Sequence, residues 1–207
     1  VVGGPTRLGE RVDLDHAADH LFGICLVNDW SARDIQAWEY VPLGPFLGKS
    51  FATSVSPWVM PLAALEAARV PGPAQDPPPL EYLVDADPWA LDLAIQVEWN
   101  STVVSRPPFA SMYWTPGQQL AHLTVNGASL RTGDLFASGT VSGPEREQRG
   151  SFLELSWGGT EQVLIGGDET RTFLEDGDTV TLRATAPGAE GTRIGFGPLT
   201  GTVLPAR

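Results

Sequence analysis

Glycine and proline place the strongest limit on how this chain can fold. The 23 glycines and 18 prolines make up about a fifth of the 207 residues, and they follow no fixed period. A content of this kind without a repeat argues against collagen and against disorder, and it favours a protein with many turns between short strands. We therefore predict a β-rich protein with a few short helices.

The chain is long enough to bury a substantial core as one domain. Residues 71–79 contain five prolines and have the composition of a linker. Strand patterns resume at 91–99, however, and no second independent core follows. We interpret the proline-rich segment as an extended surface excursion and predict one domain over residues 1–207.

Local patterns indicate where the elements lie. Ser31 is placed as the N-cap of a helix with Asp34 in the capping-box position, and Thr115 begins another helix with proline and glutamine behind it. The apolar run at 23–28 predicts a strand that is buried on both faces. We also expect helices at 13–22 and 62–69, an ordered loop with a strand at 41–61, a strand at 152–157, and hairpins among 163–165, 171–174 and 179–182.

The charge of the chain limits its partners. The formal net charge is −12 and the sequence pI is about 4.5. Such a surface repels phosphate backbones and acidic lipid, so nucleic acid and membrane surfaces are disfavoured. A carboxylate substrate would be repelled too, unless a bound metal ion or a few placed cations supply a positive centre.

Other sequence features exclude several classes of protein. The single cysteine, Cys25, rules out an internal disulfide and reads as a small buried hydrophobe. No apolar stretch approaches the roughly 20 residues that a membrane helix needs. The chain begins at Val1 without an initiator methionine, so we expect a fragment of a longer protein.

Asp29 is the first candidate site residue. It ends the expected strand and precedes the expected helix, where backbone N–H groups favour an ionised carboxylate. An oxygen donor of this kind suits a hard cation such as Ca²⁺ or Mg²⁺, although Asp29 could equally do no more than cap the turn. Arg33, Gln36 and Tyr40 share one face of the following helix. This face could bind the substrate, or it could be an ordinary solvated face.

Lys49 is the second candidate. It is the only lysine of the chain, beside twelve arginines, in a segment rich in glycine, proline and hydroxyl residues. A lysine ammonium is a compact point charge on a flexible stem and does not replace arginine at a chemical site, so its placement suggests a role. A compositional bias with one leftover lysine is the alternative. Thr53 follows four residues later.

A glycine-hydroxyl loop and an acidic residue complete the candidates. The loop at 138–143 contains Thr140 and could present backbone N–H groups to an anion, but it lacks the ending of a nucleotide-binding P-loop. Glu154 alternates with apolar residues, so it either points inward as the partner of a general base or faces solvent. His16 and His20 have the spacing of a helical zinc pair without the accompanying glutamate, which makes zinc an unfavoured interpretation. His122 is expected to pack in or to cap its helix.

Taken together, these motifs resemble the C-terminal catalytic domain of the fumarylacetoacetate hydrolase family. The resemblance rests on the segments at 28–34, 38–51, 57–58, 133–135, 137–140 and 153–157, which follow one another in order over the whole chain. It implies an α+β, β-rich fold, a mixed β-roll or sandwich with a few short helices. It also implies a cytoplasmic, metal-dependent hydrolase of tyrosine and phenylalanine breakdown that cleaves a carbon–carbon bond in 4-fumarylacetoacetate to give fumarate and acetoacetate.

The same resemblance implies roles for single residues. Asp29 would be a ligand of Mg²⁺ or Ca²⁺, with Lys49 and Thr53 around the metal site. Gln36 and Lys49 would stabilise the oxyanion that forms when water attacks the carbonyl. Further implied roles are substrate binding by Gln36, Tyr40 and Thr140, and orientation of the base histidine by Glu154.

The resemblance is incomplete in one respect. The family's base histidine, a substrate-binding arginine and three further acidic metal ligands match no residue of this chain, and none of its histidines takes the place of the base. We therefore expect the chain alone to be nearly inactive and to bind metal weakly. The family also implies a homodimer, for which Trp89 and Trp99 are candidate exposed apolar positions.

Two other functions remain open from the sequence. One is a different activity of the same superfamily, such as an acylpyruvate hydrolase or a keto-acid decarboxylase. The other is a non-catalytic, β-rich binding domain that has kept the fold and lost the site. Loss of activity on removal of the Lys49 ammonium from the full-length protein would separate a hydrolase from a binding domain.

Overall fold

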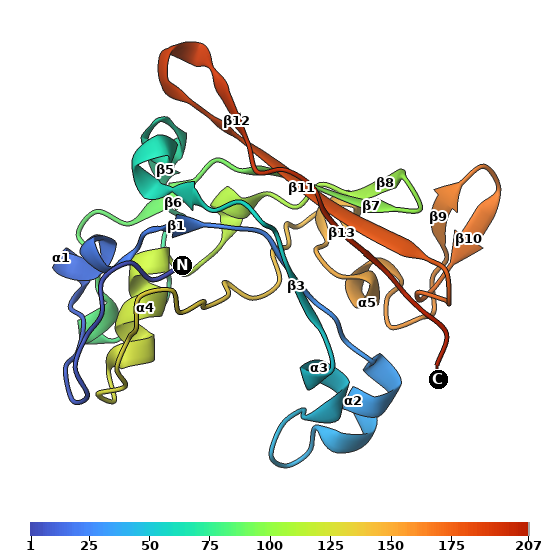
Figure 1. The fold of residues 1–207 in the computed structure, drawn as a ribbon, viewed down its shortest axis with the longest axis horizontal. Coiled ribbons are helices and arrows are strands. Elements are labelled where there is room, and N and C mark those ends of the chain that lie inside the picture. Colours follow the sequence, from blue (N-terminus) through green and yellow to red (C-terminus); the bar gives the residue numbers. More distant parts are fainter. Residues whose placement is uncertain (207) are drawn as a thin grey trace.

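A computed structural model describes residues 1–206 and has a mixed α+β fold in which short helices surround antiparallel strands (Figure 1). The fold class predicted from the sequence is thereby confirmed. The α-helices are α1 (Leu14–Ala17), α2 (Arg33–Glu39), α3 (Leu47–Ser50), α4 (Pro116–Thr124) and α5 (Phe152–Leu155). The strands are β1 (Gly23–Ile24), β2 (Val27–Asp29), β3 (Thr53–Val55), β4 (Met60–Pro61), β5 (Arg69–Pro71), β6 (Trp89–Leu91), β7 (Ala94–Trp99), β8 (Thr102–Ser105), β9 (Val163–Gly166), β10 (Glu169–Arg171), β11 (Thr179–Pro187), β12 (Arg193–Gly195) and β13 (Leu199–Thr202). Six 3₁₀ helices join them: Ala18–His20, Leu62–Ala68, Glu81–Leu83, Phe109–Ser111, Arg146–Gln148 and Ala189–Gly191.

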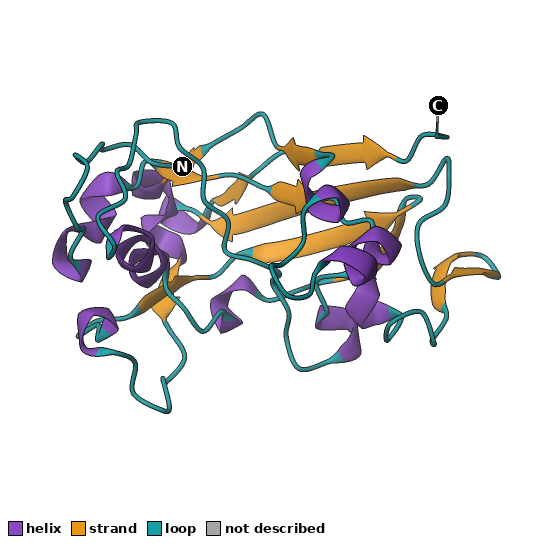
Figure 2. Ribbon diagram, turned by 90° about the horizontal axis from the view of Figure 1, so that it is seen from below, coloured by secondary structure: helices purple, strands orange, loops and turns teal. Residues whose placement is uncertain are grey.

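A five-stranded antiparallel sheet forms the centre of the molecule (Figures 1 and 2). The long strand β11 pairs with β7, β12 and β13, and β8 continues the sheet beyond β7. Leu91, Ala184, Ala186 and Phe196 are buried together in the main core against this sheet. Burial of one apolar side chain contributes roughly 1.5–3 kcal/mol, so this cluster is the main stabilising feature of the sheet.

Trp99 belongs to a second buried cluster at the other end of β7. Its side chain is fully buried, and its ring stacks on Phe152 of α5 with 4.3 Å between centroids. Trp89 is half-buried and packs on the main core, with the Arg69 guanidinium 4.7 Å from its ring. The prediction that Trp89 and Trp99 are exposed is therefore wrong, because both lie in strands whose apolar face is covered.

Residues 30–52, called here the α2–α3 arm, project from the body of the molecule (Figure 1). The two-stranded ribbon of β2 and β3 carries the arm, and its register sets Asp29 opposite Thr53. Trp30 connects the ribbon to the large sheet. Its indole N–H donates to Ser54 Oγ of β3 at 2.8 Å. Its ring packs on Gly201 of β13, where an added Cβ atom would lie 2.5 Å from Trp30 Cζ2. The glycine in β13 thus allows the tryptophan to pack on the strand.

Several expected elements are confirmed. Helix α4 has the complete capping box: Thr115 Oγ1 accepts from the Gln118 amide, and Gln118 Oε1 accepts from the Thr115 amide. Strands occur in the segments expected at 41–61, 91–99, 163–165 and 179–182. No helix of the described residues is long and apolar enough to span a bilayer.

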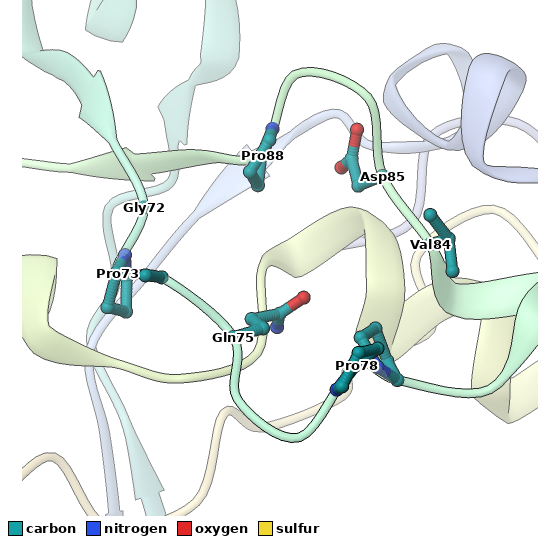
Figure 3. A pocket seen from close by; sticks show the side chains of 9 residues that line it. Gly72, Pro73, Gln75, Pro78, Val84, Asp85 and Pro88 are labelled. Carbon is teal, nitrogen blue, oxygen red and sulfur yellow. The ribbon is translucent and has the colours of Figure 1, made fainter.

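The proline-rich segment is an excursion, as the sequence indicates, and it borders a shallow hollow (Figure 3). Gln75 anchors it, because its side-chain amide donates to Gln118 Oε1 at 3.0 Å and to the Tyr113 carbonyl at 2.8 Å. Gln118 is fully buried and donates in return to Gln75 Oε1 at 2.8 Å. The reciprocal pair satisfies a polar group that would otherwise be buried without a partner.

Other expectations about local structure are wrong. The helix expected at 13–22 is one α-helical turn followed by a 3₁₀ turn, and the helix at 62–69 is a 3₁₀ helix. The strand at 23–28 breaks between Ile24 and Val27, and Val27 is 38% exposed because the second half pairs with β3 away from the core. Strand β10 ends at Arg171 and pairs only with β9, so no hairpin joins it to β11.

Two caps also differ from expectation. Helix α2 begins after Ala32, and no side chain caps it, because the Ser31 hydroxyl is used elsewhere. Glu154 lies in helix α5 and not in a strand. Ser151 caps this helix in a reciprocal box with Glu154, an interaction that the alternation of apolar residues does not reveal.

Candidate functional site

Asp29 and Lys49 form an ion pair at the base of the arm. The Lys49 ammonium lies 2.6 Å from Asp29 Oδ2, and the Lys49 side chain is 27% exposed. Asp29 ends β2 and Lys49 lies in α3, so the ribbon and the reversal of the chain through the arm bring them together. Two residues singled out from the sequence, twenty positions apart, thus share one site.

Ser31 is the second partner of Lys49. The ammonium donates to Ser31 Oγ at 2.6 Å, and the Ser31 hydroxyl donates to the Asp29 main-chain carbonyl at 3.1 Å. The sequence suggested only a capping role for Ser31. No local signature could have revealed this contact, because it joins positions 18 residues apart.

Glu39 holds the helix that carries Lys49. Its carboxylate accepts from the main-chain amides of Phe46 at 2.8 Å, Leu47 at 3.0 Å and Gly48 at 2.7 Å. Desolvation alone would raise the pKa of Glu39, but the hydrogen bonds from Gly48, Phe46 and Leu47 outweigh it and lower the pKa below its usual value. Sequence reasoning missed Glu39 as a separate contributor, since its partners lie seven to nine residues away.

Gly48 lets α3 pack directly on α2. A Cβ atom on residue 48 would lie 2.8 Å from the Gln36 main-chain nitrogen and 3.0 Å from the Ala32 carbonyl oxygen. The Gly48 carbonyl accepts from the Ala32 amide at 2.9 Å. Glycine before Lys49 is therefore required by the close approach of two main chains.

Helix α2 carries the expected polar residues. Arg33 Nη1 donates to Gln36 Oε1 at 2.9 Å, which orients the Gln36 amide so that its NH₂ group points away from Arg33. Tyr40 follows the last turn and is 53% exposed. On the remaining surface, Trp38 is 91% exposed and Ile35 is 44% exposed, so the arm presents apolar as well as polar side chains.

Glu154 is the centre of a second polar cluster. Ser142 Oγ donates to its carboxylate at 2.9 Å, and Ser151 donates to Oε2 through its hydroxyl at 2.8 Å and its amide at 3.1 Å. Arg149 donates to the Glu154 main-chain carbonyl at 3.0 Å and lies over the Trp157 ring. Glu154 is half-buried, and these hydrogen bonds hold it in one orientation. The alternative that Glu154 is a surface residue facing solvent from a strand is therefore wrong.

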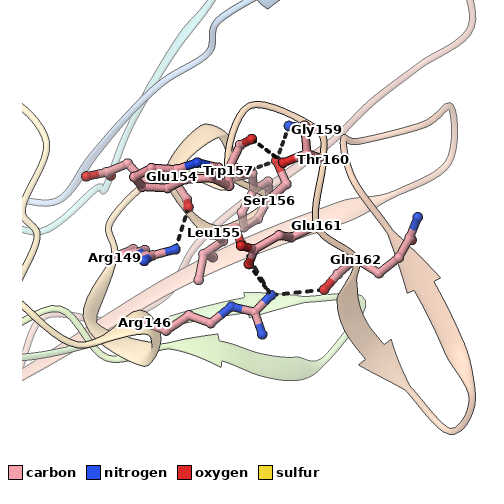
Figure 4. A network of polar contacts seen from close by, with 11 residues as sticks. Arg146, Arg149, Glu154, Leu155, Ser156, Trp157, Gly159, Thr160, Glu161 and Gln162 are labelled. Carbon is pink, nitrogen blue, oxygen red and sulfur yellow. Dashed lines mark hydrogen bonds and ion pairs between the residues drawn. The ribbon is translucent and has the colours of Figure 1, made fainter.

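Arg146 closes the end of helix α5 (Figure 4). Its guanidinium donates to the carbonyls of Leu155 at 3.4 Å and Gln162 at 3.0 Å, and it lies 3.4 Å from Glu161 Oε2. A cation at the C-terminal end of a helix interacts favourably with its carbonyl groups. This arrangement supports the helix that positions Glu154.

The two clusters remain separate among residues 1–206. No hydrogen bond or ion pair of the described part of the chain joins Asp29 or Lys49 to Glu154. The arm and α5 lie on the same side of the large sheet (Figure 1). Thr140 is exposed in the loop before Ser142, and Thr53 is exposed opposite Asp29.

The donors available for a metal are few. Within residues 1–206, no three His, Cys, Asp or Glu side chains gather in a way that could hold a cation. Hard cations such as Ca²⁺ and Mg²⁺ need about six oxygen ligands, while this site offers the Asp29 carboxylate and the nearby Thr53 hydroxyl. The described residues therefore fit one side of a cation site and do not form a complete one.

The three histidines have other partners. His20 Nδ1 lies 2.9 Å from the Gly4 carbonyl oxygen, and His16 lies 3.5 Å from Asp19. His122 stacks on Tyr82, whose hydroxyl is 2.8 Å from its Nδ1. Neither His16 nor His20 is part of a metal cluster among the described residues. Cys25 is half-buried, and desolvation raises the pKa of its thiol, consistent with a small packing residue.

Comparison with known proteins decides the family. The protein-family model described as fumarylacetoacetate (FAA) hydrolase C-terminal matches residues 1–204. The chain belongs to this fumarylacetoacetate hydrolase family. Proteins named fumarylacetoacetase are 53% identical over 211 residues in Homo sapiens, 55% over 212 residues in Caenorhabditis elegans and 50% over 212 residues in Arabidopsis thaliana.

The match covers only part of these relatives. It includes 99–100% of this chain and 50% of each of the three relatives, so the chain spans about half the length of the curated proteins it matches. The family resemblance predicted from the sequence motifs is confirmed by the match to the family model over residues 1–204.

Solved structures agree on the fold. A fumarylacetoacetate hydrolase from Exiguobacterium antarcticum superposes with a TM-score of 0.57 at 17% identity, over 99% of this chain and 53% of that one. A 5-carboxymethyl-2-hydroxymuconate delta-isomerase from Mycobacterium smegmatis gives a TM-score of 0.54 at 21% identity, over 99% and 55% of the two chains. At this identity the similarity shows that the fold of the family extends to this chain.

Proposed function

We propose that the protein is a hydrolase that cleaves the carbon–carbon bond of 4-fumarylacetoacetate to give fumarate and acetoacetate, with residues 1–207 acting as one catalytic domain. The observation that carries the proposal is the ion pair of Asp29 and Lys49 in a family member, with Gln36 on the helix that packs against the one carrying Lys49. In a chain of net charge −12, this is where an anionic substrate would find a placed cation.

Lys49 and Gln36 would bind the oxygen that becomes negative when water attacks the carbonyl. The ammonium has three N–H donors, of which Asp29 and Ser31 accept two, so one is left for the substrate. A guanidinium can only donate hydrogen bonds, so the Gln36 atom that faces Arg33 is its oxygen. The Gln36 NH₂ group is then free to donate to the substrate. Each such donor at a developing oxyanion contributes about 3–4 kcal/mol.

Tyr40 and Thr140 would bind the ends of the substrate. Both are exposed, and within the described residues neither hydroxyl takes part in a hydrogen bond. Glu154 would orient a histidine base through Oε1, which has only the Ser142 hydroxyl as a donor, whereas Oε2 also accepts twice from Ser151. Since His16, His20 and His122 lie elsewhere, we propose that the base comes from outside this chain.

We propose Mg²⁺ or Ca²⁺ as the cofactor, with Asp29 and Thr53 as the contributions of this chain. When bound, such a cation would act as a Lewis acid on the two oxygens of the diketone. The Lys49 ammonium has no lone pair to give to a metal, so it would lie beside the cation and not ligate it. Lys49 would keep its hydrogen bonds to Asp29 and Ser31 and hold a proton near the substrate oxygen.

We also propose a cytoplasmic homodimer that acts on a small diketo acid, without nucleic acid or membrane as partner. Trp99 is not available for a dimer interface because it is buried. Large exposed apolar side chains occur on the arm, at Trp38, Leu43 and Leu47. Burial of such a surface between two copies would be favourable, and light scattering of the protein measures whether it occurs.

The test is the loss of 4-fumarylacetoacetate, followed by its absorbance, with full-length protein and with residues 1–207 alone. We expect turnover by the full-length protein and little by the shorter chain. Turnover of acylpyruvates or decarboxylation of keto acids in its place would assign the protein to another activity of the superfamily. No turnover of any of these substrates would favour a binding domain.

A further inference from the structure

The Ser31 hydroxyl has a defined direction. An ammonium can only donate, so the Ser31 oxygen must accept the hydrogen bond from Lys49 at 2.6 Å. Its own hydrogen is then directed to the Asp29 carbonyl at 3.1 Å. The hydroxyl therefore presents a lone pair to the ammonium, and main-chain atoms of β2 hold it in that orientation.

The Ser31 side chain does not cap helix α2. It precedes helix α2, but the N-cap is Ala32 and no side chain caps the helix. Among the described residues, its hydroxyl forms hydrogen bonds only with Lys49 and with the Asp29 carbonyl. Although Ser31 precedes a helix, its side chain therefore binds the Lys49 ammonium and does not cap the helix.

A single ion pair would not fix the direction of an ammonium on a flexible four-carbon stem. Asp29 Oδ2 supplies one acceptor at 2.6 Å, and Ser31 Oγ supplies a second at the same distance. Two fixed acceptors determine where the third N–H points. The Lys49 side chain is 27% exposed, so it is not closed off from solvent.

We propose that Ser31 is a positioning residue that aims the Lys49 ammonium at the substrate oxygen. This inference rests on the proposed function, in which Lys49 donates to the developing oxyanion. Ser31 itself does not touch the reacting atoms. Its contribution is to hold the lysine side chain in one rotamer before substrate arrives.

The single lysine of the chain makes this directly measurable. With ¹³C-labelled lysine, the chain of residues 1–207 gives one lysine Cε resonance, that of Lys49, so no assignment is needed. We expect the two ε protons of the native side chain to have different shifts and the methylene to relax as a restricted group. In Ser31→Ala the two shifts should merge and the methylene should become mobile, whereas Ser31→Thr should keep the native signature.

Ser50→Ala is the matched control, because Ser50 lies beside Lys49 in α3 and is exposed. Its lysine spectrum should equal that of the unmodified chain, and the Tm of each variant shows whether it is folded. A Ser31→Ala spectrum that equals the native one, in a folded protein, would overturn the proposal. Equal changes in Ser31→Ala and Ser50→Ala would also overturn it.

A kinetic arm uses the full-length enzyme. We expect Ser31→Ala to lower kcat by about tenfold to a hundredfold with little change in KM, because a misaimed group slows the chemical step more than binding. Ser31→Thr should recover most of the loss. If the unmodified enzyme does not cleave 4-fumarylacetoacetate, the proposed function fails, while the lysine spectrum still decides whether Ser31 positions Lys49.

Discussion

Gly48 and Gln36 lie so close together that a Cβ atom at position 48 would be 2.8 Å from the Gln36 main-chain nitrogen. The contact joins the helix that carries the Lys49 ammonium to the helix that carries the Gln36 amide. Backbone atoms cannot move aside as a flexible side-chain end can. The separation of α2 and α3 is therefore set by the absence of a side chain at one residue.

Gly48→Ala should separate the two helices and disturb the site. We expect a loss of about 1–3 kcal/mol in unfolding free energy, as for overpacked positions, together with a large loss of activity in the full-length enzyme. Chemical denaturation and the diketone assay measure the two effects. Gly195→Ala is the control, because a Cβ atom there meets nothing within 4 Å. Equal stability of the two variants would contradict the packing argument.

Lys49→Met should remove activity and leave the fold intact. The change deletes the ammonium and keeps most of the apolar stem, so we expect kcat to fall by about 10²–10³-fold, as on loss of an oxyanion donor. Partly exposed ion pairs contribute little to stability, so Tm should change by a few degrees at most.

Arg131→Met removes the cation of another exposed pair, 3.4 Å from Asp134, and should leave kcat unchanged. Lys49→Arg tests geometry, since a planar guanidinium keeps the charge and loses the compact shape. Full activity of Lys49→Met would remove Lys49 from the proposed mechanism.

Glu39→Gln should loosen α3 without unfolding the protein. An amide offers one acceptor oxygen in place of two, so it cannot accept all three hydrogen bonds from Phe46, Leu47 and Gly48. We expect hydrogen exchange at these three amides to accelerate by about tenfold or more. Glu66→Gln, which alters only an exposed pair with Arg69, should leave their exchange unchanged.

Asp178 should make the stability of the sheet depend on pH. The Asn100 side chain donates to Oδ1 at 2.7 Å and the Glu175 amide donates to Oδ2 at 2.8 Å. Desolvation opposes ionisation, but these hydrogen bonds outweigh it and lower the pKa of Asp178 below its usual 3.8. The folded protein therefore binds the proton more weakly than the unfolded chain. The resulting stabilisation is present above about pH 4 and is lost as pH falls through the folded pKa.

Urea denaturation between pH 2 and 6 measures this contribution. Asp178→Asn should be less stable than the native protein at pH 6 by about 1–3 kcal/mol, with the difference shrinking at low pH. Asp176→Asn changes an exposed neighbour and should follow the native curve. A difference that stays constant from pH 2 to 6 would show that ionisation of Asp178 does not contribute.

The sequence predicts some of this molecule well for physical reasons. The capping box of α4 lies within four residues, so local chemistry determines it. The same logic was available for Glu154, because Ser151 precedes it by three residues, yet the alternation of apolar residues around it favoured a strand. Here the capping box was the correct signal.

Other features depend on long-range packing. Trp99 lies at the end of β7, and it is buried by residues from distant elements, among them Phe152 and Leu155 of α5 and Val163 of β9. The contact of Asp29 with Lys49 requires the ribbon register and the close packing of α2 on α3. Its prediction came from family resemblance, because no spacing rule connects positions twenty residues apart.

The attachment of Trp30 to Gly201 has a mechanical consequence. Asp29, Ser31 and Lys49 all lie at this contact or farther along the arm, on the β2–β3 ribbon and the segments that it carries. Packing of the indole on β13 therefore sets how far the whole arm lies from α5, while the hydrogen bonds among Asp29, Ser31 and Lys49 set their own arrangement. The distance of these side chains from α5 and the direction of the ammonium are therefore set by different contacts, the first by Trp30 on Gly201 and the second by Asp29 and Ser31.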